Sequence, residues 1–478
     1  MLPPPILYSS RLFENSSALF FHEAGGPPLE ALLQILWQHQ RLRRTALRTV
    51  DGTVLRVLHP GFRNREAGPD FRGAVLKFGD RSPLAGDIEI DRVSEGWKAH
   101  GHASNPAFSK VILHVIWEGT GSASTHPTLA LHNFLDAPVA ELSEWAKSAA
   151  TLWPEELRGQ CCAPLRSLAA GDLNRLLEQA AKARLERKGL EIAMRARAGS
   201  WDGVLWEALF RGLGYKKNAW PMQSVAELLP KFELPSDSVL VWQARLLGLS
   251  GLLPDELAGQ TAQARRYLRQ AWDHWWRERD ALQNVQLPRS LWTFHGQRPV
   301  NHPQRRLALA AHWLASGDLL KKLSVWFKSV DPRERKAALP GGLTAVLQGR
   351  PDPYWSRHWT FRSKSFPKPR PLLGVDRASD LAMNAVLPWF WSRARALEKT
   401  DEMAKAEALY MAWPKSEDNA VLKLARQRLL GTATDRAFTS AASQQGLLQI
   451  VGDFCVQAGS LCVECRFPEL ARQARAES

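Results

Sequence analysis

Three acidic side chains alternate with apolar ones in the segment GDIEID, residues 86–91. In a β-strand successive side chains point to opposite faces, so Asp87, Glu89 and Asp91 would line one face while Ile88 and Ile90 line the other. Carboxylates packed together raise one another's pKa and cost stability unless a cation compensates them. The spacing therefore predicts a metal site, although an amphipathic strand with a solvated acidic face has the same pattern.

A further acid stands at the start of another strand-like run, in the sequence Pro69-Asp70. Mg²⁺ or Mn²⁺ takes oxygen ligands, and carboxylates from two adjacent strands supply them while water and substrate phosphate fill the other positions. We expect Asp70 and Glu89 to bind such an ion and to act in catalysis, with Asp87 or Asp91 as an additional ligand.

Histidines gather in the same region, at His59, His100, His102 and His114. An H-x-H pair on an extended segment points both rings the same way, so His100 and His102 could chelate a metal, contact phosphate or act as a general base. His114 lies within an apolar strand, where a buried, hydrogen-bonded structural histidine is expected.

The elements that must position these residues change in kind along the chain. The first 150 residues predict a helix over residues 28–44 and strands at TVLRVLHP, AVLKFG, GDIEID and KVILHVIWEG, separated by Gly, Pro and Asp. After Trp153 helical periodicity dominates, as in residues 172–198 with Asp172 as N-cap, and residues 352–374 form a long basic loop. We expect an α+β protein with a mixed-sheet domain over residues 1–150, a helical domain over residues 151–478 and a boundary near residues 149–164.

The net charge of +15 is confined to the second part of the chain, because the first 150 residues hold 15 Lys and Arg against 15 Asp and Glu. Nucleic acid is the commonest anionic partner of such a domain, although a dispersed excess also serves solubility. Most of the 20 tryptophans follow residue 150, where we expect a packing role for the majority. The predicted phosphate contacts are Arg298, Arg305, Arg306, Arg357, Arg362 and Lys364.

Five cysteines form a second group: Cys161 and Cys162 are adjacent, and Cys455, Cys462 and Cys465 follow near the C-terminus. Cysteines in this composition are typical of a tetrahedral zinc or iron–sulfur site, and reduced, unligated thiols are the alternative. The predicted ligands are Cys161, Cys455, Cys462 and Cys465.

Pro69-Asp70 followed by Glu89-Ile90-Asp91 resembles the motif of the PD-(D/E)xK nuclease superfamily. The resemblance implies a nuclease-like sheet domain in which Asp70 and Glu89 hold Mg²⁺ and a helix acid is supplied by Glu30. This chain departs from the motif because Asp91 occupies the place of the catalytic lysine, so either Lys77, Lys98 or Lys110 supplies that charge from elsewhere or the site is inactive. The cysteines are similar, with different spacing, to the iron–sulfur staple of certain nucleases of that superfamily.

Over nearly its whole length the chain resembles a bacterial family of uncharacterised proteins, the domain of unknown function 2851 family. The stretches that carry the resemblance include GPDFRGA, GDIEIDRVSEGWKAHGH, VILHVIW, GYKKNAWPM and QRPVNHPQRRLALAA. In that family His usually stands where this chain has Asp91, which puts a histidine-dependent role at that position in doubt.

Together these patterns predict a metal-dependent nuclease-like protein that acts on nucleic acid. The alternative is a non-catalytic nucleic-acid-binding or scaffold protein with a degenerate nuclease fold. No apolar run approaches the roughly 20 residues that cross a bilayer, and the N-terminal sequence lacks the pattern of a signal peptide. We therefore expect a cytoplasmic protein without a membrane partner.

Overall fold

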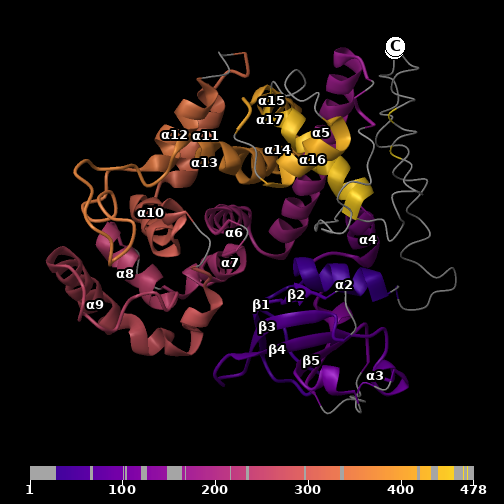
Figure 1. The fold of residues 1–478 in the computed structure, drawn as a ribbon, viewed down its shortest axis with the longest axis horizontal. Helices are drawn as coiled ribbons and strands as arrows, with labels where there is room; N and C mark the ends of the chain where they lie inside the picture. The colour runs from indigo at the N-terminus through magenta and orange to yellow at the C-terminus, as the bar shows by residue number, and fades with distance from the viewer. Residues whose placement is uncertain are drawn as a thin grey trace.

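The computed structural model describes residues 28–147, apart from 29, 65–67, 101, 103–104 and 120–125, and residues 164–456, apart from 167, 216, 233–235, 295–297, 334–337, 417–419 and 432–439, together with Phe467 and Ala471. The N-terminal part is a curled mixed sheet with helices packed on it, and the long α5 leads from it into a large helical region (Figure 1). The fold is therefore α+β, as the sequence predicts.

The N-terminal part alternates short strands with short helices. Its elements are α2 (Glu30–His39), β1 (Leu55–His59), β2 (Phe62–Arg63), β3 (Phe71–Phe78), β4 (Leu84–Ile90), α3 (Gly96–Ala99), β5 (Val111–Ile116), β6 (Thr128–Ala130) and α4 (Val139–Lys147). The strand order is β1-β3-β4-β5-β6, with β2 beside β3. Pairs up to β3–β4 are antiparallel, whereas β4–β5 and β5–β6 are parallel, so β4 lies at the change of direction.

One face of the sheet carries the N-terminal core. Ile88 and Ile90 of β4 and Leu113 and Val115 of β5 are buried there with apolar side chains of α2 and α4, including Trp37. Figure 1 shows α2 lying across the sheet. Because side chains alternate along a strand, the even-numbered isoleucines of β4 fill this core and leave the acidic side chains outside it.

The helical region is built on two further apolar cores. Its helices are α5 (Ala170–Ala198), α6 (Trp201–Leu213), α7 (Ala219–Glu227), α8 (Val239–Leu249), α9 (Ala262–Leu282), α10 (Pro303–Ser316), α11 (Leu319–Ser329), α12 (Leu339–Gln348), α13 (Val375–Leu381), α14 (Leu387–Ala396), α15 (Thr400–Ala412), α16 (Ala420–Leu430) and α17 (Ala441–Ile450). Residues 349–374 form the predicted loop, without regular secondary structure. No helix in the described ranges is long and apolar enough to span a membrane.

The element predictions hold except at helix ends. The four predicted strands are present, and helix α2 ends at His39 because Gln40 adopts a left-handed φ of 51°. Asp172 is not an N-cap: Ala169 occupies that position, and Asp172 lies in the first turn of α5, where it pairs with Arg175. The predicted boundary near residues 149–164 falls almost entirely outside the described residues.

Two buried arginines after α2 join the N-terminal part to the helical region. Arg41 follows α2, and its guanidinium pairs with Asp136 at 2.9 Å, donates to Met194 Sδ of α5 and lies 4.4 Å from the ring centroid of Trp145. Arg44 pairs similarly with Glu227 of α7 at 2.8 Å. Charged pairs at this junction fix how the sheet domain sits against α5 and α7.

Replacing Arg41 with alanine should destabilise the protein by about 3–5 kcal/mol, because the Asp136 carboxylate would remain buried without its cation. Arg41 is completely buried, so water cannot substitute for it. Urea unfolding of Arg41→Ala beside Arg43→Ala, which removes an exposed arginine two residues away, measures the difference. Equal stability of the two variants would contradict a role for the ion pair.

Candidate functional site

The acidic face of β4 lies opposite a histidine of β5. In the parallel pairing of these strands Glu89 is the register partner of His114, and Asp91 N donates to Val115 O at 2.9 Å. Glu89 and Asp91 are 7% and 1% exposed, so the alternative of a solvated acidic face does not hold for these two residues. Both carboxylates instead lie in a partly buried site.

Asp70 and Glu89 lie side by side, as expected. The backbone N–H of Asp70 donates to Glu89 Oε2 at 3.2 Å, and Ile90 N donates to Asp70 Oδ2 at 3.0 Å. The pairing of β3 and β4 is irregular at this point, between Phe71 and Ala74. Next to this irregularity the Asp70 side chain accepts the N–H of Ile90 while the Asp70 N–H binds Glu89, and these two bonds hold the acids together.

Helix α2 adds a third carboxylate to the site. Gln34 Nε2 donates to Glu30 Oε1 at 2.9 Å and to Asp70 Oδ1 at 2.8 Å, so one amide bridges two acids. Arg63 of β2 donates to Gln34 Oε1 at 2.6 Å. Glu30 therefore lies beside Asp70, and the nuclease resemblance implies a helix acid at this residue. The sequence gives no signal for Gln34 and Arg63, because only tertiary packing brings them to the site.

Three histidines complete the site. His100 Nδ1 lies 3.1 Å from Asp91 Oδ1, His114 Nε2 lies 2.9 Å from Asp91 Oδ2, and His102 Nδ1 lies 3.4 Å from Glu89 Oε1. His114 is fully buried and hydrogen-bonded, which confirms its predicted structural character. In contrast, the side chain of His100 is 56% exposed, so the site is open to solvent on its side.

The carboxylates disfavour ionisation because they are buried together. Burial first, and then the charge of Glu30, raises the pKa of Asp70 to about 7. Burial and the charge of Asp70 raise the pKa of Glu89 to about 9, and burial followed by the charge of Asp91 raises the pKa of Glu30. A site that resists holding its negative charges is one that a cation stabilises.

Other residues predicted for this site lie apart from it. Asp87 accepts a hydrogen bond from the backbone of Gly73 at 3.0 Å in an exposed position. Lys77 donates to the backbone carbonyl of Asn284, at the opposite end of β3 from Asp70. Lys98 and Lys110 are exposed. Among the cations, Arg63 is the one whose charge acts on Asp70 and lowers its pKa against the effect of burial.

The predicted phosphate contacts divide into buried and exposed side chains. Arg305 is completely buried and Arg306 is 2% exposed, and their guanidinium groups donate to the carbonyls of Pro371 and Leu372. The prediction does not hold for these two, because they fix the end of the 349–374 loop from inside. Arg357 is partly buried and donates to two carbonyls of the same loop, whereas the exposed residues are Arg298, Arg362 and Lys364.

The cysteine prediction falls largely outside the described residues. Cys161, Cys462 and Cys465 lie there, and the side chain of Cys455 is likewise not described. A zinc or iron–sulfur site at these residues stays a prediction.

Helix α9 has a basic face that was not predicted from the sequence. On α9 the exposed residues include Arg265, Arg266, Arg269 and Arg277, and Trp276 is 61% exposed with the Arg279 guanidinium 3.8 Å from its ring centroid. The sequence signal for this face is that the arginines recur with the 3.6-residue period of a helix, on the side away from the buried positions. By contrast Trp275, Trp355, Trp389 and Trp391 are buried, as expected for packing.

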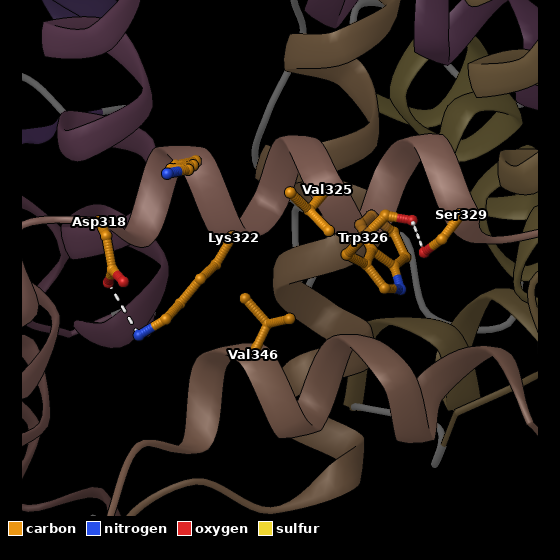
Figure 2. A pocket seen from close by; sticks show the side chains of 7 residues that line it. Asp318, Lys322, Val325, Trp326, Ser329 and Val346 are labelled. Atoms are coloured by element: carbon orange, nitrogen blue, oxygen red, sulfur yellow. Dashed lines mark hydrogen bonds and ion pairs between the residues drawn. The ribbon is translucent and has the colours of Figure 1, made fainter.

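A surface hollow of about 450 Å³ lies elsewhere, between α11 and α12 (Figure 2). Asp318 and Lys322 pair with one another at its edge, and Ser329 donates to the Trp326 carbonyl. Its lining includes Val325 and Val346 and offers a single carboxylate that is already paired. The acidic site on β4 therefore remains the better candidate for chemistry.

Comparison with known proteins gives a family and no activity. A family model described as "Protein of unknown function (DUF2851)" matches residues 30–420. No curated protein and no solved structure matches the chain.

The stability of the metal-free protein should fall with rising pH, and Glu89→Gln should remove part of that fall. Glu89 binds a proton on folding between its usual pKa near 4.5 and its folded pKa of about 9, so the stability is full below this window and lost across it. The slope is about 1.4 kcal/mol per pH unit for one group. Glutamine can still accept from Asp70 N.

Urea unfolding from pH 5 to pH 9 in chelator measures this difference between wild type and Glu89→Gln. Asp87→Asn, on the same strand but outside the site, should retain the wild-type dependence. Parallel curves for wild type and Glu89→Gln would contradict the expected proton uptake.

Proposed function

The chain belongs to the DUF2851 family of proteins of unknown function, and from the geometry of its acidic site we propose that it is a metal-dependent nuclease that cleaves nucleic acid. The observation that carries the proposal is the adjacency of Asp70, just before β3, and Glu89 on β4: Asp70 N donates to Glu89 Oε2 at 3.2 Å, and Ile90 N donates to Asp70 Oδ2 at 3.0 Å. Oxygen ligands fixed in this way suit Mg²⁺ or Mn²⁺.

Asp70 and Glu89 would hold the ion, with Glu30 approaching from α2. A divalent ion at this position activates water and stabilises the leaving oxygen of a phosphodiester. Gln34 fixes the Asp70 and Glu30 carboxylates, and Arg63 adds the positive charge that the motif lysine would supply. The resemblance to the PD-(D/E)xK superfamily supports this assignment, because an acid at the start of one strand and an acid within the next are its defining pair.

His100 is the best placed base. Its imidazole is exposed on the open side of the site, and its Nδ1 faces the Asp91 carboxylate at 3.1 Å. A carboxylate in that position orients the ring. Asp91 is itself held from the other side by His114, so it is positioned to support His100 rather than to contact substrate.

Nucleic acid is the proposed substrate because the helical region presents arginines beside an exposed aromatic ring. The α9 face carries this combination, and exposed cations also flank the 349–374 loop. Arginines bind phosphates without regard to base, and an exposed tryptophan can stack on an unpaired base.

A non-catalytic nucleic-acid-binding or scaffold protein is the second candidate. The observation that favours it is that Asp91 stands in the lysine position of the motif, while Lys77 is directed to the carbonyl of Asn284. On this alternative the α9 face would still bind nucleic acid, but the acidic site would not cleave it.

The direct test is cleavage of single- and double-stranded DNA and RNA with Mg²⁺ or Mn²⁺. Asp70→Ala and Glu89→Ala should each lower the rate by roughly 100-fold or more, because each removes an ion ligand. Asp87→Ala changes the same residue type on the same strand outside the site and should retain activity. Binding without cleavage by every form would leave the scaffold alternative, and unchanged cleavage by Asp70→Ala would place the activity elsewhere.

Reversing the charge of the α9 face should weaken nucleic-acid binding. In Arg265→Glu/Arg269→Glu the lost phosphate contacts should lower affinity and reduce the salt dependence by about one for each contact removed. Fluorescence anisotropy with a labelled single strand at several salt concentrations measures both. Lys399→Glu, an exposed change at the N-cap of α15, is the matched control, and equal binding by all three proteins would exclude the α9 face.

A further inference from the structure

The geometry points to a first-row transition-metal ion as the ion of this site, bound by Asp91, His100 and His102. The inference names the metal class and a set of ligands beside Asp70 and Glu89, and to that extent rests on the proposed function. It concerns residues outside the acidic pair that the nuclease motif implies, and it assigns His100 to the ion in place of the role of base given to it under the proposed function. Two imidazoles and one carboxylate are the donors that Mn²⁺, Fe²⁺, Co²⁺ and Zn²⁺ accept, whereas Mg²⁺ prefers oxygen alone.

The three side chains already lie close to a binding arrangement. One ligand atom from each of Asp91, His100 and His102 lies within 4.8 Å of the other two. His100 Nδ1 is 3.1 Å from Asp91 Oδ1. Ligands at about 2.1 Å from a common ion stand some 3–3.5 Å apart in tetrahedral or octahedral geometry, so small side-chain rotations complete the set.

The ring of His102 supplies the second observation. His102 is 8% exposed, and its Nδ1 is buried without a hydrogen-bond partner. The atom lies 3.4 Å from Glu89 Oε1, close enough for electrostatic attraction, but it forms no hydrogen bond there. A buried ring nitrogen left unbonded costs free energy, and an ion bound among the carboxylates would remove that cost.

The positions of His102 and Asp91 are fixed by their surroundings. Phe108 stacks on the His102 ring at 4.0 Å between centroids, and Trp97 meets it edge-on at 5.3 Å. His114 pairs with Asp91 and orients its carboxylate, as hydrogen-bond partners of metal ligands commonly do. Gly96 makes room for it, because a Cβ at that position would lie 2.5 Å from Asp91 Oδ1.

The exposure of His100 gives the ion a path from solvent. Its side chain is 56% exposed, whereas the other two ligands are buried, so an ion entering past His100 meets a prepared pair. Glu89 Oε1 lies near His102 and offers a fourth donor. The same carboxylate is bonded to Asp70 N, which connects the histidine set to the acidic pair.

Co²⁺ alone, titrated into metal-free protein without nucleic acid, is the test. Visible absorption bands and calorimetry should show one bound ion in the wild type, and His100→Ala and His102→Ala should each weaken binding at least about tenfold. His132→Ala, which removes an exposed histidine that contacts Trp117, should bind as the wild type does. His100→Ala changes an exposed side chain, so it remains informative if His102→Ala does not fold.

Equal Co²⁺ affinity in all four proteins, or loss of binding in Asp70→Ala with both histidine variants unaffected, would overturn the inference. The proposed function fails separately: Co²⁺ binding that requires the histidines, without cleavage of any nucleic acid, would refute the nuclease and leave the metal site. Cleavage with Mg²⁺ that is unaffected in His100→Ala and His102→Ala, with no histidine-dependent Co²⁺ binding, would refute the metal site and leave the nuclease.

Discussion

The site depends on the reciprocal contact between Asp70 and β4. The N–H of Asp70 donates to the Glu89 carboxylate, and the Asp70 carboxylate accepts from the N–H of Ile90. Carboxylates therefore take the place of backbone carbonyls as acceptors at this point between the two segments. Burial raises the pKa of both carboxyl groups, and these two hydrogen bonds hold the acids side by side where their charges disfavour it. The bonds fix position, while burial leaves the charges themselves largely uncompensated.

The uncompensated negative charge of the site affects how any substrate can approach it. Four carboxylates, from Glu30, Asp70, Glu89 and Asp91, act on one another electrostatically in this site. A phosphodiester would be repelled by such a group, even in a protein whose net charge is +15. In the proposed nuclease, a bound divalent ion would reverse the local sign and so serve the approach of the substrate as well as the chemistry. The arginines of α9 would then contribute affinity rather than local neutralisation.

The sequence predicted those parts of the site that follow from strand alternation. Glu89 and Asp91 point away from the core because Ile88 and Ile90 enter it, and this relation is readable from five residues. Gln34 and Arg63 were not predictable, since they meet Asp70 only through the packing of α2 and β2 on β3. Exposure was equally hard to read: Arg305 stands beside loop-like Pro and Gln residues, yet it is buried because loop carbonyls elsewhere in the chain require donors. The basic face of α9 was not predicted from the sequence, and the burial of its other residues shows which face is free.

Asp91 stands where the nuclease motif that the chain resembles has a lysine, and this difference changes the electrostatics of the site in a definite direction. A lysine after Glu89-Ile90 would pair with the neighbouring acids and offer a positive charge to the transition state. Asp91 instead adds a negative charge, and histidines occupy the space around it, with His114 on one oxygen and His100 on the other. His102 stands beside them with a buried nitrogen that the protein does not satisfy. If a side chain must supply the positive charge of the site, aspartate at this position means that the charge is lost. If a metal ion supplies it, the aspartate and the imidazoles around it are suited to the site.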